Sequence, residues 1–499
     1  MPDALPSDVA GEGATQDLPG ASAAPVGRAP IGRESGGLWS VERRPLTVGL
    51  VLTITLVAAE ALAVSTAMPI VAADLGGLEL YGLVFSAFLV GSLIGIVVAG
   101  SLIDRRGVVA PFLVGLTFFA VGLALGGSAV SMPMLIAARL IQGIGGGAIP
   151  PIAYVAIGRS LPENLRPQMF ATLSTAWILP GIFGPAIAGV VAQELNWRLI
   201  FFGLLPVLAV SGWLAYRGLR RLGHEPSPKA TGGATGSRIR DGLIVGFGVA
   251  VLTAGLASEN LAIEVLIGVL GLAITMWAFV RLVPPGTLRA ERGYPTAVLL
   301  RGLLTFAFFS IDAYVALLLV EVRGWSAAAA GIALTAATVS WTAGSWTQAR
   351  LSRRFEHEWF VRLGFPVVAV GIAGLGLILL PGVPAWLSVP IFALAGFGMG
   401  LAYAQFALIV LRDVPRDSQG TVTSGLTLSD SLGTALGTSV AAAFVSAAVR
   451  AGTGPAPGLA AAIVVGTAAA ILGWLLSPRL HLADRAPAAV AAEARARLR

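Results

Sequence analysis

Charged residues are almost absent from the fourteen long apolar stretches that make up most of this 499-residue chain. Each stretch is roughly as long as a helix must be to cross the hydrocarbon core of a bilayer, which takes about 20 residues. Well inside the stretches, away from their ends, lie one clear arginine, Arg139, and three carboxylates, Glu60, Asp312 and Asp430. The pattern predicts an all-α polytopic membrane protein, because only helices and closed barrels satisfy their backbone in lipid.

The composition agrees with this prediction and excludes a water-soluble fold. Hydrophobic residues make up 56% of the chain, charged residues only 12%, and the mean hydropathy is +0.84. The apolar runs place the expected fourteen transmembrane helices at 46–70, 82–103, 108–127, 133–157, 169–192, 199–219, 241–258, 261–283, 297–321, 327–349, 360–380, 385–411, 421–448 and 457–477.

The basic residues test this helix count, because short cytoplasmic loops of membrane proteins carry an excess of lysine and arginine. With the N-terminus inside, three arginines fall outside and Arg139 lies within a span, which leaves 29 of the 33 basic residues inside. This distribution predicts a multi-pass protein of the bacterial cytoplasmic (inner) membrane with both termini in the cytoplasm. Loop arginines also explain the net charge of +7 without a nucleic-acid partner.

Two pairs of similar segments indicate that the chain contains an internal repeat. GSLIDRRG at 100–107 follows the second span, and GSWTQAR at 344–350 follows the tenth; GIGGG at 143–147 and GFGMG at 396–400 lie in the fourth and twelfth spans. Small residues that allow close helix contact could match by chance in any membrane protein. The equivalent positions of both pairs favour a repeat of six helices.

The repeat and the polar linkers together predict the organisation of the chain. Two six-helix pseudo-repeat bundles are joined through an inserted two-helix hairpin. The expected parts are a disordered cytoplasmic tail (1–44), an N-terminal six-helix bundle (45–221), a cytoplasmic linker (222–240), the inserted hairpin (241–283), a second linker (284–296), a C-terminal six-helix bundle (297–478) and a cytoplasmic tail (479–499).

The loop after the second span carries a G-x-x-x-D-R-x-G pattern, at Gly100, Asp104, Arg105 and Gly107. This pattern resembles the loop between the second and third helices of the major facilitator superfamily, where it implies a conformational switch. An aspartate at this place can cap a helix N-terminus. We therefore expect Asp104 to contact the start of the thirteenth span near Gly420 in the outward-facing state. Ordinary positive-inside chemistry is the alternative explanation of the motif.

The fourth and fifth spans carry two further elements of the same superfamily. Arg139 to Gly143 resembles its R-x-x-x-G element. PGIFGPAIAG at 180–189 resembles the G-P-x-x-G-G element of exporters, at Gly181, Gly184, Pro185 and Gly189, although Pro180 and Ala188 depart from it. In one interpretation the Gly-Pro dipeptide bends the helix and gives it a face for close packing. In the other it is a packing kink that has no bearing on the direction of transport.

Glu60 lies nine residues before Pro69 in the first span, where the fourteen-helix drug:proton antiporter branch of the superfamily commonly has an aspartate. The resemblance implies a proton-coupled exporter of amphiphilic small molecules that works by alternating access. An exporter or flippase of an endogenous lipid or secondary metabolite is the alternative, and a non-transporting membrane enzyme is a distant one. The chain has no cysteine and no nucleotide-binding loop, and we expect no cofactor, metal or nucleotide. Its partners would be a small-molecule substrate, protons and the bilayer.

Depth estimates group the charged residues into a proton-coupling constellation. At about 1.5 Å per residue, Glu60, Arg139 and Asp312 fall in the outer half of the bilayer and Asp430 near its midplane. Burial and a neighbouring arginine act in opposite senses on a carboxylate's affinity for protons, so an acid that moves between water and Arg139 can carry one. The hypothesis assigns Glu60 as the principal carrier and Asp312 as a second acid that favours cationic substrates. Asp430 either takes part or bonds to neighbouring hydroxyls.

Overall fold

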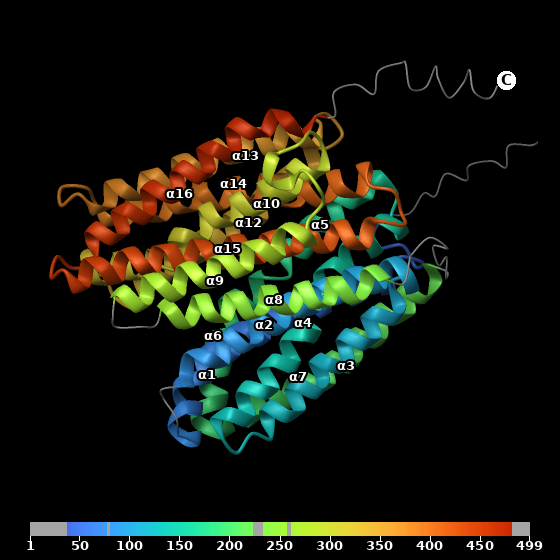
Figure 1. Cartoon of the computed structure of the whole chain (residues 1–499), viewed down its shortest axis with the longest axis horizontal. Helices are drawn as coiled ribbons and strands as arrows, with labels where there is room; N and C mark the ends of the chain where they lie inside the picture. The colour runs from blue at the N-terminus through green and yellow to red at the C-terminus, as the bar shows by residue number, and fades with distance from the viewer. Residues whose placement is uncertain (1–36, 77–79, 223–232, 257–260, 482–499) are drawn as a thin grey trace, which may run out of the picture. The chain divides into compact units, whose positions relative to one another are not determined.

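The structure, a computed structural model, describes residues 37–76, 80–222, 233–256 and 261–481, and this part of the chain folds into helices without strands (Figure 1). From Leu38 onward the described chain packs as one unit. The first half contains α1 (Arg44–Leu75), α2 (Tyr81–Arg106), α3 (Val109–Gly127), α4 (Met132–Ser160), α5 (Arg166–Thr175), α6 (Ile178–Val190) and α7 (Arg198–Leu219). The remainder contains α8 (Gly233–Leu256), α9 (Leu261–Leu282), α10 (Tyr294–Asp312), α11 (Val315–Leu317), α12 (Ala327–Leu351), α13 (His357–Leu375), α14 (Ser388–Asp413), α15 (Gln419–Arg450) and α16 (Ala456–Leu476).

Every expected span overlaps helical structure, and twelve helical segments of the described chain are long and apolar enough to cross a membrane. Two of these segments are interrupted helices. Glu163–Asn196 runs through α5, α6 and a π-helical turn, η3 (Val191–Asn196), and Tyr294–Val322 runs through α10, α11 and a second π-turn, η6 (Leu318–Val322). The twelve do not include α8 and α12. The expected tails 1–44 and 479–499 lie largely outside the described residues, as do residues 223–232 of the expected linker 222–240. Residues 233–240 of that linker instead form the start of α8.

The repeated glycines make matching contacts in the two halves. A Cβ on Gly143 or Gly147 of α4 would collide with backbone carbonyls of α2, and a Cβ on Gly396 or Gly400 of α14 would collide with backbone carbonyls of α12. These contacts bring the helix pairs α2–α4 and α12–α14 backbone to backbone, as small residues do in membrane proteins. The similar segments therefore occupy equivalent places in the two halves.

Two apolar clusters form the core, and only one of them joins the halves. The larger cluster contains Ile96 and Ile157 from the first half together with Leu304 and Leu426 from the second. The smaller cluster contains only residues between Leu56 and Leu208, from α1 to α7. One end of the first half therefore shares a core with the second half, and its other end is packed by itself.

Hydrogen bonds between the halves gather at the end where the core is shared. They involve the C-terminal parts of α2, α4 and α12, both ends of α5 and the start of α15. Examples are Gln348 Nε2 to the Pro167 carbonyl at 3.5 Å and Trp346 Nε1 to Thr175 Oγ1 at 3.0 Å. Ser174 Oγ and Ser345 Oγ are 3.0 Å apart at the same end. This end of the bundle is called the closed end below.

The helices α8 and α9 pack against one another, and α8 also packs against α2 and α15 (Figure 1). Arg450 Nη2, at the end of α15, donates to Glu264 Oε2 of α9 at 2.7 Å. Arg238 Nη2 of α8 donates to the Leu282 carbonyl at the end of α9. This helix pair thus contacts both halves of the molecule.

Candidate functional site

Glu60 of α1 and Arg139 of α4 form an ion pair inside the first half, as the shared depth of the two residues predicted. Both side chains are buried, at 0% and 3% exposure. Arg139 Nη1 also donates to Gln142 Oε1 at 2.7 Å. Glu60 Oε2, Arg139 Nε and Gln142 Nε2 have no hydrogen-bond partner among the described residues. A buried charge pair with unsatisfied polar atoms is costly, which is typical of functional rather than purely structural sites.

The glycine of the R-x-x-x-G element places the arginine. Gly143 lies one turn after Arg139 on the same face of α4, and a Cβ there would collide with the Phe88 carbonyl of α2. Because α4 lies directly against α2 at this point, the Arg139 guanidinium carbon lies 4.3 Å from the centre of the Phe88 ring. Such a cation–π contact favours the charged guanidinium in an apolar setting.

A second charged cluster lies between α10, α14 and α15 and includes Asp430. Arg301 Nε donates to Asp430 Oδ1 at 3.0 Å, and Tyr403 Oη donates to Asp430 Oδ2 at 3.0 Å. Arg301 also donates to the Tyr403 carbonyl, and its guanidinium carbon lies 3.1 Å from the centre of the Tyr403 ring. Its Nη2 donates to the hydroxyl of Tyr154 on α4 at 3.3 Å, so this cluster reaches across to the first half.

Arg301 was not among the expected site residues, and its burial corrects the count of basic residues on the cytoplasmic side. It lies four residues inside the expected span 297–321, close enough to the end to be taken for a surface arginine, but only 1% of its side chain is exposed. Close packing of α10 on α15 explains its burial, because a Cβ on Gly433 of α15 would collide with the Gly302 carbonyl. Asp430 therefore pairs with an arginine and a tyrosine, beyond the hydroxyl contacts considered from the sequence.

Asp312 ends α10 and belongs to neither cluster. It is partly buried and forms no ion pair or side-chain hydrogen bond with the described residues. The four residues that were grouped by depth are thus divided into the Glu60–Arg139 pair, the Arg301–Asp430 pair and a lone acid. Depth along a helix axis does not specify the direction in which a side chain points, and this is the physical reason for the division.

Asp104 makes the contact that its motif predicted. Its Oδ1 accepts the N–H of Gly420 at 2.7 Å and its Oδ2 accepts the N–H of Thr421 at 2.7 Å. These two N–H groups belong to the first turn of α15, where the positive end of the helix dipole favours a carboxylate. We call this contact the Asp104 latch. It joins the two halves at the closed end.

Local packing and backbone conformation explain why the same motif has glycine at two of its positions. Gly100 faces α15, and a Cβ there would lie 2.8 Å from the Gly420 carbonyl oxygen. Gly107 ends α2 with a φ of 71°, a left-handed conformation that costs glycine little. Arg105 lies in the last turn of α2, where a positive charge complements the helix dipole.

The prediction that the exporter-like element forms a close packing face is wrong for this structure. A Cβ added to Gly181 would have no atom within 4 Å. The nearest atom to a Cβ on Gly184 would be Leu62 Cβ at 3.8 Å, and the nearest to a Cβ on Gly189 would be Thr66 Cγ2 at 3.9 Å. Pro185 lies inside α6 and is exposed. The helix contacts α1 loosely and leaves most of its apolar side chains uncovered, so these glycines are not required by close contact here.

Comparisons with known proteins agree with this architecture. Residues 50–438 match the model of the Major Facilitator Superfamily. The chain is 26% identical over 411 residues to multidrug resistance protein 3 of Bacillus subtilis, covering 78% of this chain and 77% of the relative. It is 35% identical over 157 residues to the acurin A biosynthesis cluster MFS-type transporter of Aspergillus aculeatus, covering 32% of this chain and 28% of the relative.

The fold is similar to that of a solved transporter. The crystal structure of the human organic anion transporter MFSD10 superposes with a TM-score of 0.65 at 15% identity, covering 87% of this chain and 99% of the other. The fold and the relatives are those of transporters and not of enzymes. The chain therefore belongs to the Major Facilitator Superfamily.

Proposed function

We propose that this protein is a proton-coupled exporter of amphiphilic small molecules that works by alternating access. The observation that carries the proposal is the buried Glu60–Arg139 ion pair, which lies in the first half of a bundle whose relatives include a multidrug resistance protein. No nucleotide site is needed, because an ion gradient supplies the energy. Inward movement of one proton down 100 mV yields about 2.3 kcal/mol, enough for roughly a fiftyfold concentration ratio.

Proton coupling follows from the chemistry of the pair. A proton on Glu60 removes the negative charge that holds Arg139, and Arg139 can then turn toward Gln142, which it already contacts. A cationic or amphiphilic substrate that enters the cavity competes with the proton for the same carboxylate. Proton binding and substrate binding thereby exclude one another, and this is the requirement for antiport.

Alternating access follows from the division of the core. The halves share apolar packing and the Asp104 latch at the closed end, while the opposite end of the first half is packed by itself. The arginine distribution places the closed end in the cytoplasm, so this structure corresponds to an outward-facing state. Rocking of bundles 45–221 and 297–478 about the buried ion pairs would open the cytoplasmic side.

We further propose fourteen membrane crossings with both termini in the cytoplasm of a bacterial inner membrane. The twelve segments of sufficient length and hydropathy become fourteen when α8 and α12, of 24 and 25 residues, are added. The pair α8–α9 would then be the inserted hairpin 241–283, because the glycine contacts match α2–α4 with α12–α14 and leave α8 and α9 without a counterpart.

Export of an endogenous lipid or secondary metabolite is the second candidate. It is favoured by the similarity to a transporter of a biosynthesis cluster, although that match covers only 28% of the relative. The same ion pairs and latch would serve such a substrate. A panel of dyes, lipids and metabolites tested in one transport assay separates the two candidates.

The decisive experiment uses proteoliposomes with an imposed pH gradient and ethidium as an amphiphilic cationic probe. Glu60→Gln keeps the shape of the side chain but cannot cycle a charge, so gradient-driven ethidium accumulation should be lost while downhill exchange persists. Glu163→Gln, which changes an exposed glutamate outside the cluster, serves as the control and should transport normally. Undiminished gradient-driven accumulation in Glu60→Gln would reject this assignment.

A further inference from the structure

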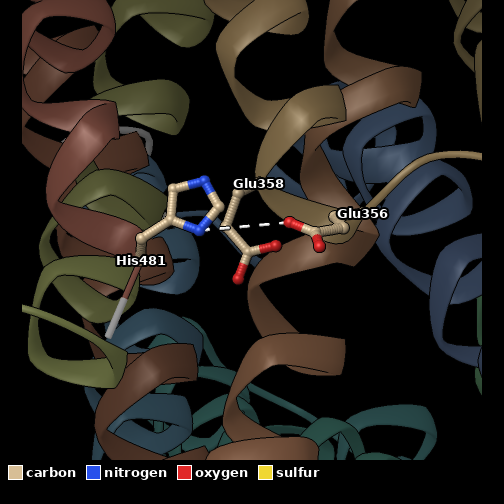
Figure 2. A group of neighbouring side chains, drawn as sticks. All are labelled: Glu356, Glu358 and His481. Atoms are coloured by element: carbon tan, nitrogen blue, oxygen red, sulfur yellow. Dashed lines mark ion pairs between the residues drawn. The ribbon is translucent and has the colours of Figure 1, made fainter. Parts of the chain in front are cut away.

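Three side chains with metal-binding atoms meet at a place that the transport proposal does not use. Glu356 and Glu358 lie at the start of α13, and His481 follows the short helix η9 (Ser477–Leu480) after α16. Their ligand atoms lie within 4.8 Å of one another. Figure 2 shows the Glu358 carboxylate beside the line that joins the His481 ring to the Glu356 carboxylate. The packing of α13 on α16 brings together residues that are more than 120 positions apart.

Glu358 provides an independent indication of a bound cation. Its side chain is only 2% exposed, and its Oε1 accepts Arg412 Nη2 at 2.6 Å. Its Oε2 is buried and has no hydrogen-bond partner within the described chain. Arg412 does not compensate both oxygens, because its Nε donates to Asp413 Oδ1 at 2.7 Å. A buried carboxylate oxygen without a partner is costly, and a metal ion would remove that cost.

The other two side chains are free to complete a site. Glu356 is 75% exposed and His481 is 50% exposed, and His481 Nδ1 lies 4.0 Å from Glu356 Oε2. Two ligands on a tetrahedral ion with bonds of about 2.1 Å are about 3.4 Å apart, so a small rotation of exposed side chains suffices. A hollow of about 640 Å³ lined by Glu356 and His481 connects the place to solvent. Arg354 and Arg362 also line this hollow, but both are exposed and can extend into water.

We propose that Glu356, Glu358 and His481 bind a divalent transition-metal ion such as Zn²⁺. Carboxylates alone would favour Mg²⁺ or Ca²⁺, whereas one imidazole nitrogen with two carboxylates is a ligand set that suits zinc and leaves a fourth position for water. The ion joins the start of α13 to the end of α16 and therefore stabilises the second half of the bundle. The proposal is independent of the transported substrate.

Zinc binding to the purified full-length protein tests this proposal directly. The chain has no cysteine and only three histidines, so few competing sites exist once any affinity tag is removed. After chelator treatment, isothermal titration with ZnCl₂ should show one ion per chain, and zinc should raise the thermal unfolding temperature. Co²⁺ in place of zinc should give the visible absorption of a ligated ion.

The variants separate this site from adventitious binding. His481→Ala and Glu356→Gln each remove one exposed ligand and should weaken zinc binding by at least about tenfold. His224→Ala and Glu163→Gln change residues of the same types elsewhere and should bind zinc as the unmodified protein does. Glu358→Gln also disturbs Arg412, so the test rests on the two exposed ligands. Absence of a one-to-one complex, unchanged affinity in His481→Ala, or equal loss in His224→Ala would overturn the proposal.

Discussion

At the scale of single residues, the two buried ion pairs differ in how fully they are satisfied. Arg301 donates to Asp430, to a carbonyl and to a hydroxyl, and Asp430 accepts a second bond from Tyr403. Glu60 and Arg139 instead share a single contact, and Glu60 Oε2 and Arg139 Nε have no partner among the described residues. Protonating the acid of a fully hydrogen-bonded ion pair breaks several interactions and is therefore unfavourable. Protonating the acid of a pair with few hydrogen bonds breaks fewer interactions. This contrast supports Glu60, rather than Asp430, as the principal proton carrier.

The Arg301–Asp430 pair should contribute mainly to stability. Arg301→Leu leaves the Asp430 carboxylate without its cation, and loss of one partner of a buried pair costs about 3–5 kcal/mol. We expect a lower unfolding temperature in thermal unfolding of the purified protein. The double variant Arg301→Leu/Asp430→Leu should recover part of this loss, and Arg353→Leu, at an exposed position, should cause none. Equal stability of Arg301→Leu and the unmodified protein would contradict this role.

Asp312 should act on substrate charge rather than on folding, because it pairs with no charged side chain in the described part of the chain, so its loss would leave no partner unpaired. Asp312→Asn should raise the KM for a cationic substrate about fivefold, which corresponds to about 1 kcal/mol of lost binding free energy. The KM for a neutral substrate should change little. Transport of one cationic and one neutral probe measures the difference, with Glu321→Gln in the same interrupted span as the control. Equal effects on both probes would exclude a charge-selective role.

At the scale of helices, glycines decide which elements lie backbone to backbone. Gly143 and Gly147 bring α4 against α2, Gly433 brings α15 against α10, and Gly100 lets α2 approach α15 across the two halves. The first two contacts lie inside the first half and the contact at Gly433 lies inside the second, so each fixes the shape of its own half. The contact at Gly100 joins the halves and must open during alternating access, so it combines close packing with a breakable hydrogen-bonded latch.

The Asp104 latch should control how often the closed end opens. Asp104→Asn loses the negative charge and one of the two acceptor oxygens at the helix N-terminus. A charge at this place is worth about 0.3–1 kcal/mol, so its loss shifts a two-state equilibrium toward the inward-facing state. In this cysteine-free chain, cysteines at Ser174 and Ser345 should cross-link readily, since their oxygens are 3.0 Å apart, and less so with Asp104→Asn. Asp417→Asn changes a nearby exposed acid and is the control. Identical cross-linking in all three backgrounds would argue against the latch.

At the scale of the whole molecule, the described chain consists of two helical halves that share one apolar cluster, and the pair α8–α9 contacts both. The hydrogen bonds between the halves and the apolar contacts that join them lie at one end, so opening there leaves the smaller cluster of the first half intact. The contacts of α8 with α2 and α15 place the helix pair beside the same moving interface. A fold of this kind can rock without breaking the core of either half.

The proposed topology can be tested by cysteine labelling in intact cells. The arginine distribution places position 232 in the cytoplasm, so Gly232→Cys should resist an impermeant external maleimide until the membrane is permeabilised. Gly382→Cys, at an exposed loop position between α13 and α14 on the proposed outer side, should react at once and serves as the positive control. Rapid labelling at position 232 together with protection at position 382 would show that the true topology is the inverse of the proposed one.

The sequence alone determined the features that depend on local composition and spacing. Apolar runs specified the helical segments, matched glycines specified the repeat, and the spacing of a motif specified that Asp104 meets the start of α15. The tertiary structure decided which charges pair, because pairing depends on the rotation and close approach of helices as well as on depth. Arg301 was therefore found only in the fold, Asp312 proved to be separate, and the glycines of α6 proved to be uncovered. Glu356, Glu358 and His481 likewise meet only because α13 packs against α16.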